Sequence, residues 1–294
     1  MLFRMWQKEE GIHRARAHYS LAMLYARHHP LALKSDLTAE QLLNEAWDIL
    51  INLDEETEQV IYEQIFNRNG IALIYYRRGD YETASKILEA AIAKLQLTTF
   101  RDGLHNTVLL NNLGRVYSAS GEYNKAEKYL KAAIELDPKF AEYWTDLAFL
   151  YLEIDKIEDA LFAAHQAEKC SSTISEIPEL IGYLLNKKGD YAKAANAYVR
   201  AWQCEPLRSD IALGAAYNFC EAGLYNEAKE WIDKVDVYKL TADQQETMDL
   251  LILELKLNRG EIDDKHSLKQ ELEILLAKYP HSEAIHENLE KLFN

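Results

Sequence analysis

The sequence predicts an all-α protein built as a linear array of helical hairpins. Pro occurs 5 times and Gly 11 times in 294 residues, while hydrophobic residues make up 48% of the chain. Helix breakers are therefore few, and there is ample apolar material for a core. Short motifs recur at a regular interval, and apolar residues around them repeat at three- and four-residue steps. That spacing is typical of amphipathic helices packed against one another.

The recurring motif is Gly–x–Tyr, at which we expect one helix to end and the next to begin. Its anchor residues are Gly79, Gly121, Asp155, Gly189 and Gly223. The intervals between them are 42, 34, 34 and 34 residues, so the first unit carries an eight-residue insertion at about 97–104. Glycine closes a helix well because it adopts positive φ without strain.

Other positions repeat in the same frame. Seven residues before the anchor stand Ala72, Gly114, Ala148, Gly182 and Ala216, and five residues after it stand Ala84, Ala126, Ala160, Ala194 and Ala228. Small residues are needed where two helix axes come close. An aromatic or leucine four residues before the anchor fills the groove beside them, and Pro138 and Pro206 end two of the units.

This frame resembles the tetratricopeptide repeat, a helical hairpin with a period of 34 residues. The third unit is most similar, with Trp144, Leu147, Ala148, Tyr151, Ala160 and Ala167 in family positions. The resemblance covers about 65–240, and Asp155, Val235 and the insertion depart from it. It implies a right-handed superhelical α-solenoid whose first helices line a concave groove for a protein or peptide.

The expected domain organisation follows from the frame. We expect an N-terminal arm or cap over 1–11, a divergent hairpin over 12–64 with an enlarged loop from His28 to Ser35, and a divergent repeat with a capping helix over 241–294. Between them lie five repeats: 65–106, 107–140, 141–174, 175–208 and 209–240. Atypical ends are expected because a terminal unit must present a polar face.

The resemblance also implies which residues face the groove. Counting from fourteen residues before each anchor, they are the second, fifth, ninth and twelfth places. These are Phe66, Asn69, Leu73 and Tyr76; Val108, Asn111, Arg115 and Ser118; Glu142, Thr145, Phe149 and Leu152; Glu176, Glu179, Tyr183 and Asn186; Asp210, Leu213, Tyr217 and Cys220. Asn112 joins them at the sixth place of the second unit.

Two rows stand out among these places. The ninth place is aromatic in three consecutive units (Phe149, Tyr183, Tyr217), and the second place of the same units is acidic (Glu142, Glu176, Asp210). Rings beside carboxylates suit an extended segment with apolar and basic side chains. The alternative is that the rings pack on neighbouring first helices and the acids form a solvated face.

Two known uses of the family are not supported by these residues. The clamp for a C-terminal carboxylate requires basic residues at places that here hold Leu73, Glu142 and Asp146, although Asn69 and Asn112 match in part. The asparagine ladder of the sugar-transferase superhelix requires Asn at the sixth place of successive units, and only Asn112 satisfies it.

Charge and cysteine content restrict the function class. The net charge of −15 disfavours nucleic acid. No apolar stretch has the length of a membrane span, and no signal segment opens the chain. Cys170, Cys204 and Cys220 have neither a disulfide pattern nor metal spacing, so we expect a cytoplasmic protein without membrane contact. Residues 1–34 carry a net charge of +4 and residues 35–62 hold eight acids, which predicts a basic helix packed on an acidic one.

No catalytic motif appears, so we expect no enzyme activity, no cofactor and no metal site. His13, His18, His28 and His29 could meet only through folding, and surface histidines are far commoner. Cys220 falls on the predicted groove face, where its thiol would be accessible.

The leading hypothesis is a scaffold or adaptor that binds an extended, basic and apolar segment of another protein in its groove. One alternative is a peptide-sensing regulator that acts on an effector in trans. Another is an accessory domain of a larger enzyme such as a transferase. Self-association through the terminal units is a further hypothesis.

Overall fold

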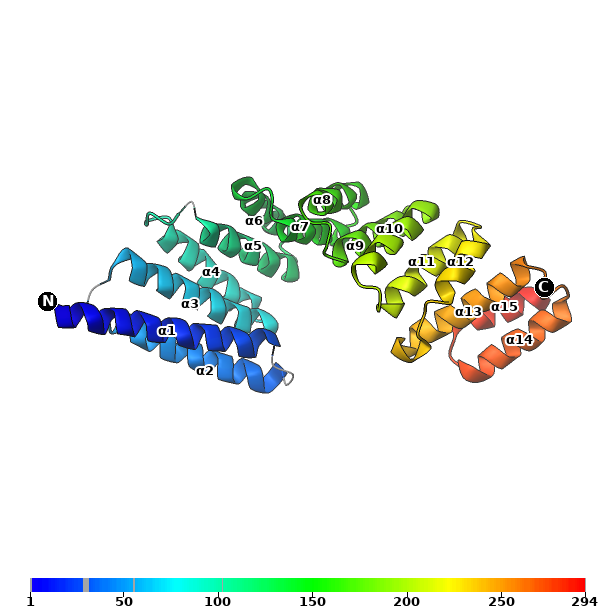
Figure 1. The fold of residues 1–294 in the computed structure, drawn as a ribbon, viewed down its shortest axis with the longest axis horizontal. Coiled ribbons are helices and arrows are strands. Elements are labelled where there is room, and N and C mark those ends of the chain that lie inside the picture. The colour runs from blue at the N-terminus through cyan, green and yellow to red at the C-terminus, as the bar shows by residue number, and fades with distance from the viewer. Residues whose placement is uncertain (1, 29–31, 55, 102, 294) are drawn as a thin grey trace. The chain divides into compact units, whose positions relative to one another are not determined.

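The computed structural model describes residues 2–28, 32–54, 56–101 and 103–293, all of its regular elements being helices (Figure 1). They fall into two compact units, 1–156 and 157–294. The first contains α1 (Leu2–His28), α2 (Ala32–Ile51), α3 (Glu58–Arg77), α4 (Tyr81–Leu95), α5 (Leu104–Ala119), α6 (Tyr123–Leu136) and α7 (Ala141–Glu153). The second contains α8 (Ile157–Cys170), α9 (Glu176–Lys187), α10 (Tyr191–Cys204), α11 (Ser209–Glu221), α12 (Tyr225–Ile232), the 3₁₀ helix η1 (Val237–Lys239), α13 (Ala242–Asn258), α14 (Lys265–Lys278) and α15 (Glu283–Phe293).

Within each unit the helices pack mainly on their neighbours in sequence, as expected of a solenoid. In the first unit α1 packs on α2, α3 on α4 and α5 on α6, and α3 also contacts the first helices α1 and α5. In the second unit α9, α10, α11 and α12 pack in succession, and α14 pairs with α15. The predicted all-α solenoid of antiparallel hairpins is confirmed.

The turns between paired helices use the left-handed backbone region that the sequence predicts. The φ angle is 79° at Gly79, 77° at Gly189 and 56° at Asp155, the one non-glycine with positive φ among the described residues. In the third repeat the amide of Lys156 donates to the carbonyl of Tyr151 at 2.8 Å, which satisfies a carbonyl at the end of α7. An aspartate can replace glycine here because a short polar side chain tolerates this region better than most.

The repeated small residues lie at close helix contacts. The alanines five residues after each anchor are fully buried: Ala84, Ala126, Ala160, Ala194 and Ala228. A Cβ added at Gly182 or at Gly214 would come within 2.8 Å of the Tyr198 ring. Tyr198 on α10 therefore packs between α9 and α11 at a separation that only glycine permits.

The N-terminal region differs from the expected organisation. α1 runs through the boundary expected at residue 11. Gly11 lies within it and lets the Leu53 side chain approach to 2.7 Å from where a Cβ would stand. Ser35, expected in a loop, lies buried within α2, and residues 29–31 are outside the described residues. The basic α1 does pack on the acidic α2, and Arg16 also pairs with Glu63 on α3 at 2.6 Å.

Two further differences concern the repeats. In the insertion, residues 97–101 form turns and bends, the Phe100 ring centre lies 4.8 Å from that of Tyr62, and the Thr99 hydroxyl donates to Glu58 at 2.5 Å. In the fifth repeat α12 ends at Ile232, so Val235 follows the helix instead of lying within it. The segment expected as a divergent repeat and capping helix, 241–294, contains α13, α14 and α15.

We predict that the turn conformation governs stability at these anchors. Gly189→Ala should lower the free energy of unfolding by about 1–2 kcal/mol, the cost of a left-handed L-residue. Space is not the reason, because nothing lies within 4 Å of a Cβ placed there. Asp155→Gly should instead leave stability unchanged or raise it. Urea unfolding of both variants measures this, and an equal loss in both would contradict it.

Candidate functional site

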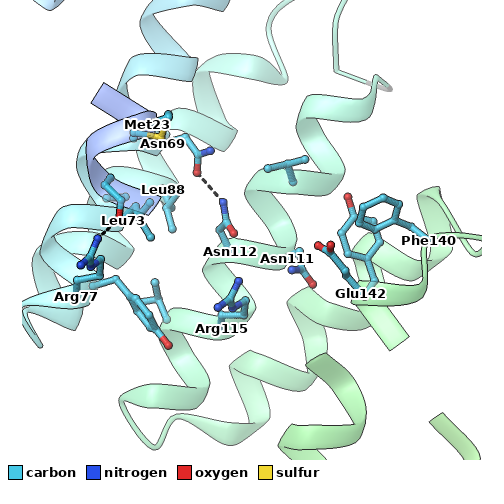
Figure 2. A pocket seen from close by; sticks show the side chains of 17 residues that line it. Met23, Asn69, Leu73, Arg77, Leu88, Asn111, Asn112, Arg115, Phe140 and Glu142 are labelled. Carbon is cyan, nitrogen blue, oxygen red and sulfur yellow. Dashed lines mark hydrogen bonds between the residues drawn. The ribbon is translucent and has the colours of Figure 1, made fainter. Parts of the chain in front are cut away.

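The first helices of the first unit surround a pocket of about 540 Å³ (Figure 2). Its wall comes from α1, α3, α4, α5 and α7 together with Phe140, which precedes α7. Eight predicted groove residues line it: Asn69, Leu73, Tyr76, Val108, Asn111, Asn112, Arg115 and Glu142. The repeat frame thus brings side chains from three successive hairpins to one hollow.

Side-chain amides form the polar part of the wall. Asn112 Nδ2 donates to Asn69 Oδ1 at 2.8 Å, which links α5 to α3 (Figure 2). Asn111 Nδ2 donates to Asp146 Oδ2 on α7 at 2.7 Å. Asn111 is only 5% exposed, and its Oδ1 accepts no hydrogen bond from the described residues. An unpaired buried carbonyl is costly, so this atom is a natural acceptor for a ligand N–H.

Charged groups stand on either side of these amides. Arg115 Nε lies 3.9 Å from Asp146 Oδ2, and half of the Arg115 side chain is exposed. Burial raises the pKa of the Asp146 carboxyl, while Arg115 and the Asn111 hydrogen bond oppose the shift. Glu142 is exposed at the start of α7. The pocket therefore offers a cation and an anion beside neutral amides.

Several lining residues lie outside the predicted set. Arg77 is paired with Asp36 at 3.0 Å and also donates to the carbonyl of Ala26. Met23 belongs to α1, whose repeat is too divergent for the frame to align. The Tyr143 hydroxyl lies 2.7 Å from Thr107 Oγ1. Arg77 stands two residues before the anchor Gly79, one place after the last groove position of its repeat. The groove positions counted from the anchor therefore did not include it.

Five predicted groove residues within 1–156 do not line the pocket. Two of them are Ser118, whose hydroxyl donates to Glu153 at 3.0 Å, and the half-buried Leu152. Phe66 belongs to an aromatic cluster, with its ring 4.3 Å from His105 and 4.9 Å from Tyr19. The Thr145 hydroxyl donates to the carbonyl of Ala141 at 3.0 Å. Phe149 is 47% exposed. Of these, Phe149 has the exposure that a contact residue requires.

In the second unit, the predicted aromatic positions are accessible but the acidic ones differ among themselves. Tyr183 is 43% exposed and Tyr217 is 37% exposed. Glu176 is exposed, whereas Arg208 holds Asp210 at 2.6 Å and Glu179 at 3.2 Å. The Arg208 hydrogen bond lowers the pKa of Asp210. Sequence reasoning missed this arginine because it is the last residue of the fourth repeat, just before α11, and lies outside the numbered groove places.

Most of the remaining predicted groove residues of the second unit have buried side chains. Leu213 is 4% exposed and lies in the core beside Cys220, so neither lines an accessible groove. The prediction that the Cys220 thiol is accessible is therefore wrong. Burial, with Glu254 nearby, raises the pKa of Cys220 to about 12. Asn186 Nδ2 donates to Asn218 Oδ1 at 2.8 Å, linking α9 to α11.

His18 has ordinary structural partners. His18 Nδ1 lies 2.8 Å from the carbonyl of Arg14, and its Nε2 lies 3.3 Å from Glu45. Within the described ranges, no three His, Cys, Asp or Glu side chains gather as metal ligands would. Among the same residues, no helix has the length and apolarity to cross a bilayer.

Comparison with known families identifies the repeats. Two family models described as "Tetratricopeptide repeat" match residues 63–139 and 105–179. Residues 63–179 are tetratricopeptide repeats. Tetratricopeptide repeats generally form scaffolds for protein–protein interactions and are typically not catalytic. No curated protein matches the chain.

Solved structures share the fold of this chain. The C-terminal part of a repeat-containing protein from Cytophaga hutchinsonii is 15% identical with a TM-score of 0.61, covering 92% of this chain and 99% of its own. PilF of Pseudomonas aeruginosa is 17% identical with a TM-score of 0.60, covering 79% and 99%. A tetratricopeptide repeat protein of Parabacteroides merdae is 16% identical with a TM-score of 0.53, covering 98% and 100%.

The raised pKa of Asp146 predicts a pH-dependent cost. An acid whose pKa is higher in the folded state destabilises the fold once it ionises, so the cost is absent below the ordinary value of 3.8 and grows as the pH rises above it. The melting temperature of Asp146→Asn relative to the parent should therefore increase from pH 4 to pH 7. Asp159→Asn, at an exposed position of α8, is the control. A constant difference would contradict the prediction.

Proposed function

We propose that this protein is a non-catalytic scaffold that binds an extended segment of a partner protein along its first helices. The pocket between α3, α5 and α7 is the principal contact in the first unit. The observation that carries the proposal is the set of amides in its wall, above all the buried and unpaired Asn111 Oδ1. The family's general use as an interaction scaffold supports it.

Side-chain amides suit the main chain of a ligand. An extended peptide presents alternating N–H and C=O groups, and an asparagine offers both an acceptor and two donors. Asn111 Oδ1 can accept from a peptide N–H. Asn112 Oδ1 likewise accepts no hydrogen bond from the described residues, because Asn112 contacts Asn69 through its Nδ2 group. A main-chain contact of this kind needs an extended ligand because a helix satisfies its own backbone groups.

Apolar and charged groups of the wall select ligand side chains. Leu73, Tyr76 and Phe140 supply apolar contact. Glu142 is exposed and suits a basic side chain, whereas Arg115 is half exposed and already near Asp146. An apolar segment with basic residues therefore fits better than an acidic one.

The second unit supports the same preference on its own first helices. Tyr183 and Tyr217 present large exposed rings, and Glu176 is an exposed carboxylate. Because Arg208 neutralises Glu179 and Asp210, Glu176 provides most of the attraction for a basic group there. An exposed ring beside a carboxylate favours a cationic side chain that also has an apolar stem.

Selection of peptides from a displayed library of random linear 12-residue sequences tests this function. One group of enriched peptides should be apolar and basic. Asn112→Ala should weaken them about tenfold, since the loss of one buried hydrogen-bonding group costs about 1–2 kcal/mol. The control is Asn196→Ala, an exposed asparagine on α10 that bonds only to its own helix.

Isothermal titration calorimetry of the enriched peptides gives the comparison, and circular dichroism verifies the fold of each variant. Equal affinity for the parent and Asn112→Ala would exclude the pocket as the contact. Failure to enrich any peptide from the library would count against linear-segment binding altogether.

A further inference from the structure

One position of the repeat frame carries an unexpected charge. Counted in the same frame, the fourth place of the five repeats is held by Arg68, Leu110, Trp144, Pro178 and Ala212. Four of these five residues are uncharged and apolar, and only the first repeat has an arginine. A guanidinium is poorly suited to a packing position, because it costs free energy to remove it from water without a partner. The exception therefore requires a physical explanation.

The structure shows what holds this arginine. The guanidinium carbon of Arg68 lies 3.5 Å from the centre of the Trp47 ring, so the side chain of α3 stacks on α2. No carboxylate among the described residues pairs with it, and burial lowers the pKa of Arg68. The stacking orients the planar group but leaves its N–H donors for another partner.

Neighbouring cations on the same side differ from Arg68 because they already have partners. Lys94 Nζ lies 2.6 Å from Glu56 Oε1 and 2.7 Å from Gln64 Oε1. Lys86 Nζ lies 2.5 Å from Glu82 Oε1. Both lysines therefore contribute little net charge, and the positive charge that lacks a partner belongs to Arg68.

An apolar pocket of about 410 Å³ adjoins the guanidinium. Its walls are Trp47 on α2, Ile65 on α3, and Ile87, Ala90 and Ala91 on α4. Lys86 and Lys94 stand at its edge. This pocket uses a different face of α3 from the one that carries Asn69, Leu73 and Tyr76, so it is separate from the amide-lined pocket.

We propose that this second pocket, formed by α2, α3 and α4, binds an acidic segment of a partner protein. The segment inserts one apolar side chain between Ile65 and Ile87 and places a neighbouring carboxylate on the Arg68 guanidinium. Arginine recognises a carboxylate through two parallel hydrogen bonds, which would compensate the buried charge.

Charge complementarity favours this ligand over other anions. The apolar walls demand an apolar side chain next to the charge, which inorganic phosphate lacks. The chain as a whole has a net charge of −15 and repels acidic molecules at long range. An acidic segment that still binds must therefore recognise a local cation. This surface is distinct from the proposed basic-segment site, so one scaffold can join two partners of opposite charge.

Arg68→Leu provides a sharp test because the second repeat has a leucine, Leu110, at the equivalent position. The variant should fold and melt no lower than the parent, since it removes a partly buried charge that no carboxylate of the described residues neutralises, and leucine can still pack on Trp47. Lys128→Leu, an exposed lysine on α6, makes the same change of charge away from the pocket and serves as the control. Arg68→Lys keeps the charge but loses the two-pronged geometry.

The displayed 12-residue library is selected in parallel on the parent, on Arg68→Leu and on Lys128→Leu, and the enriched sequences are compared. We expect a group of peptides with Asp or Glu next to a large apolar residue that is recovered with the parent and Lys128→Leu. Their affinity, measured by fluorescence anisotropy, should fall at least tenfold with Arg68→Leu and by less with Arg68→Lys. Asn112→Ala should leave it unchanged.

Three results would overturn the proposal. One is that no enriched peptide loses affinity with Arg68→Leu. Another is that those peptides which do lose affinity carry no acidic residue. The third is that inorganic phosphate or phosphatidylserine vesicles bind in an Arg68-dependent manner while acidic peptides do not. Each outcome is independent of whether basic peptides bind the amide-lined pocket.

Discussion

The close approach of paired helices is the constraint on which the remaining structure depends. At Gly114 an added Cβ would come 2.7 Å from the Leu130 side chain, and at Gly182 it would meet the Tyr198 ring. The alanines that follow each anchor are fully buried for the same reason. Because these contacts consume one face of each helix, the side chains on its other faces are available for other tasks. Repetition at a fixed interval then aligns those faces from hairpin to hairpin.

The two pockets of the first unit follow from this alignment. One face of α3 joins α5 and α7 and carries asparagine amides, and another face meets α2 and α4 and carries Arg68. In both cases a polar group that packing does not require lacks a full set of partners: Asn111 Oδ1 is buried, and the Arg68 guanidinium is partly buried. Such groups lower stability, so their presence is best explained by a ligand that completes their hydrogen bonds.

Sequence alone predicted the features that depend on local geometry and failed where longer-range packing decides. The helix ends were predictable because glycine at positive φ has one physical cause, and Asp155 follows the same rule. Leu213 was misplaced because α13 packs on α11 and buries a face that the frame leaves open. The partnership of Arg208 with Asp210 and Glu179 could not be anticipated, since the arginine belongs to a loop outside the numbered places.

Site-specific photocrosslinking tests the central claim, binding along the first helices, most directly. A photoreactive phenylalanine analogue replaces Tyr76, which lines the amide pocket, and in a second protein it replaces Tyr238, which is 97% exposed on η1. Illumination in the native host should yield a discrete adduct of one partner at Tyr76 and none at Tyr238. Adducts only at Tyr238, or the same adducts at both positions, would contradict binding along the first helices.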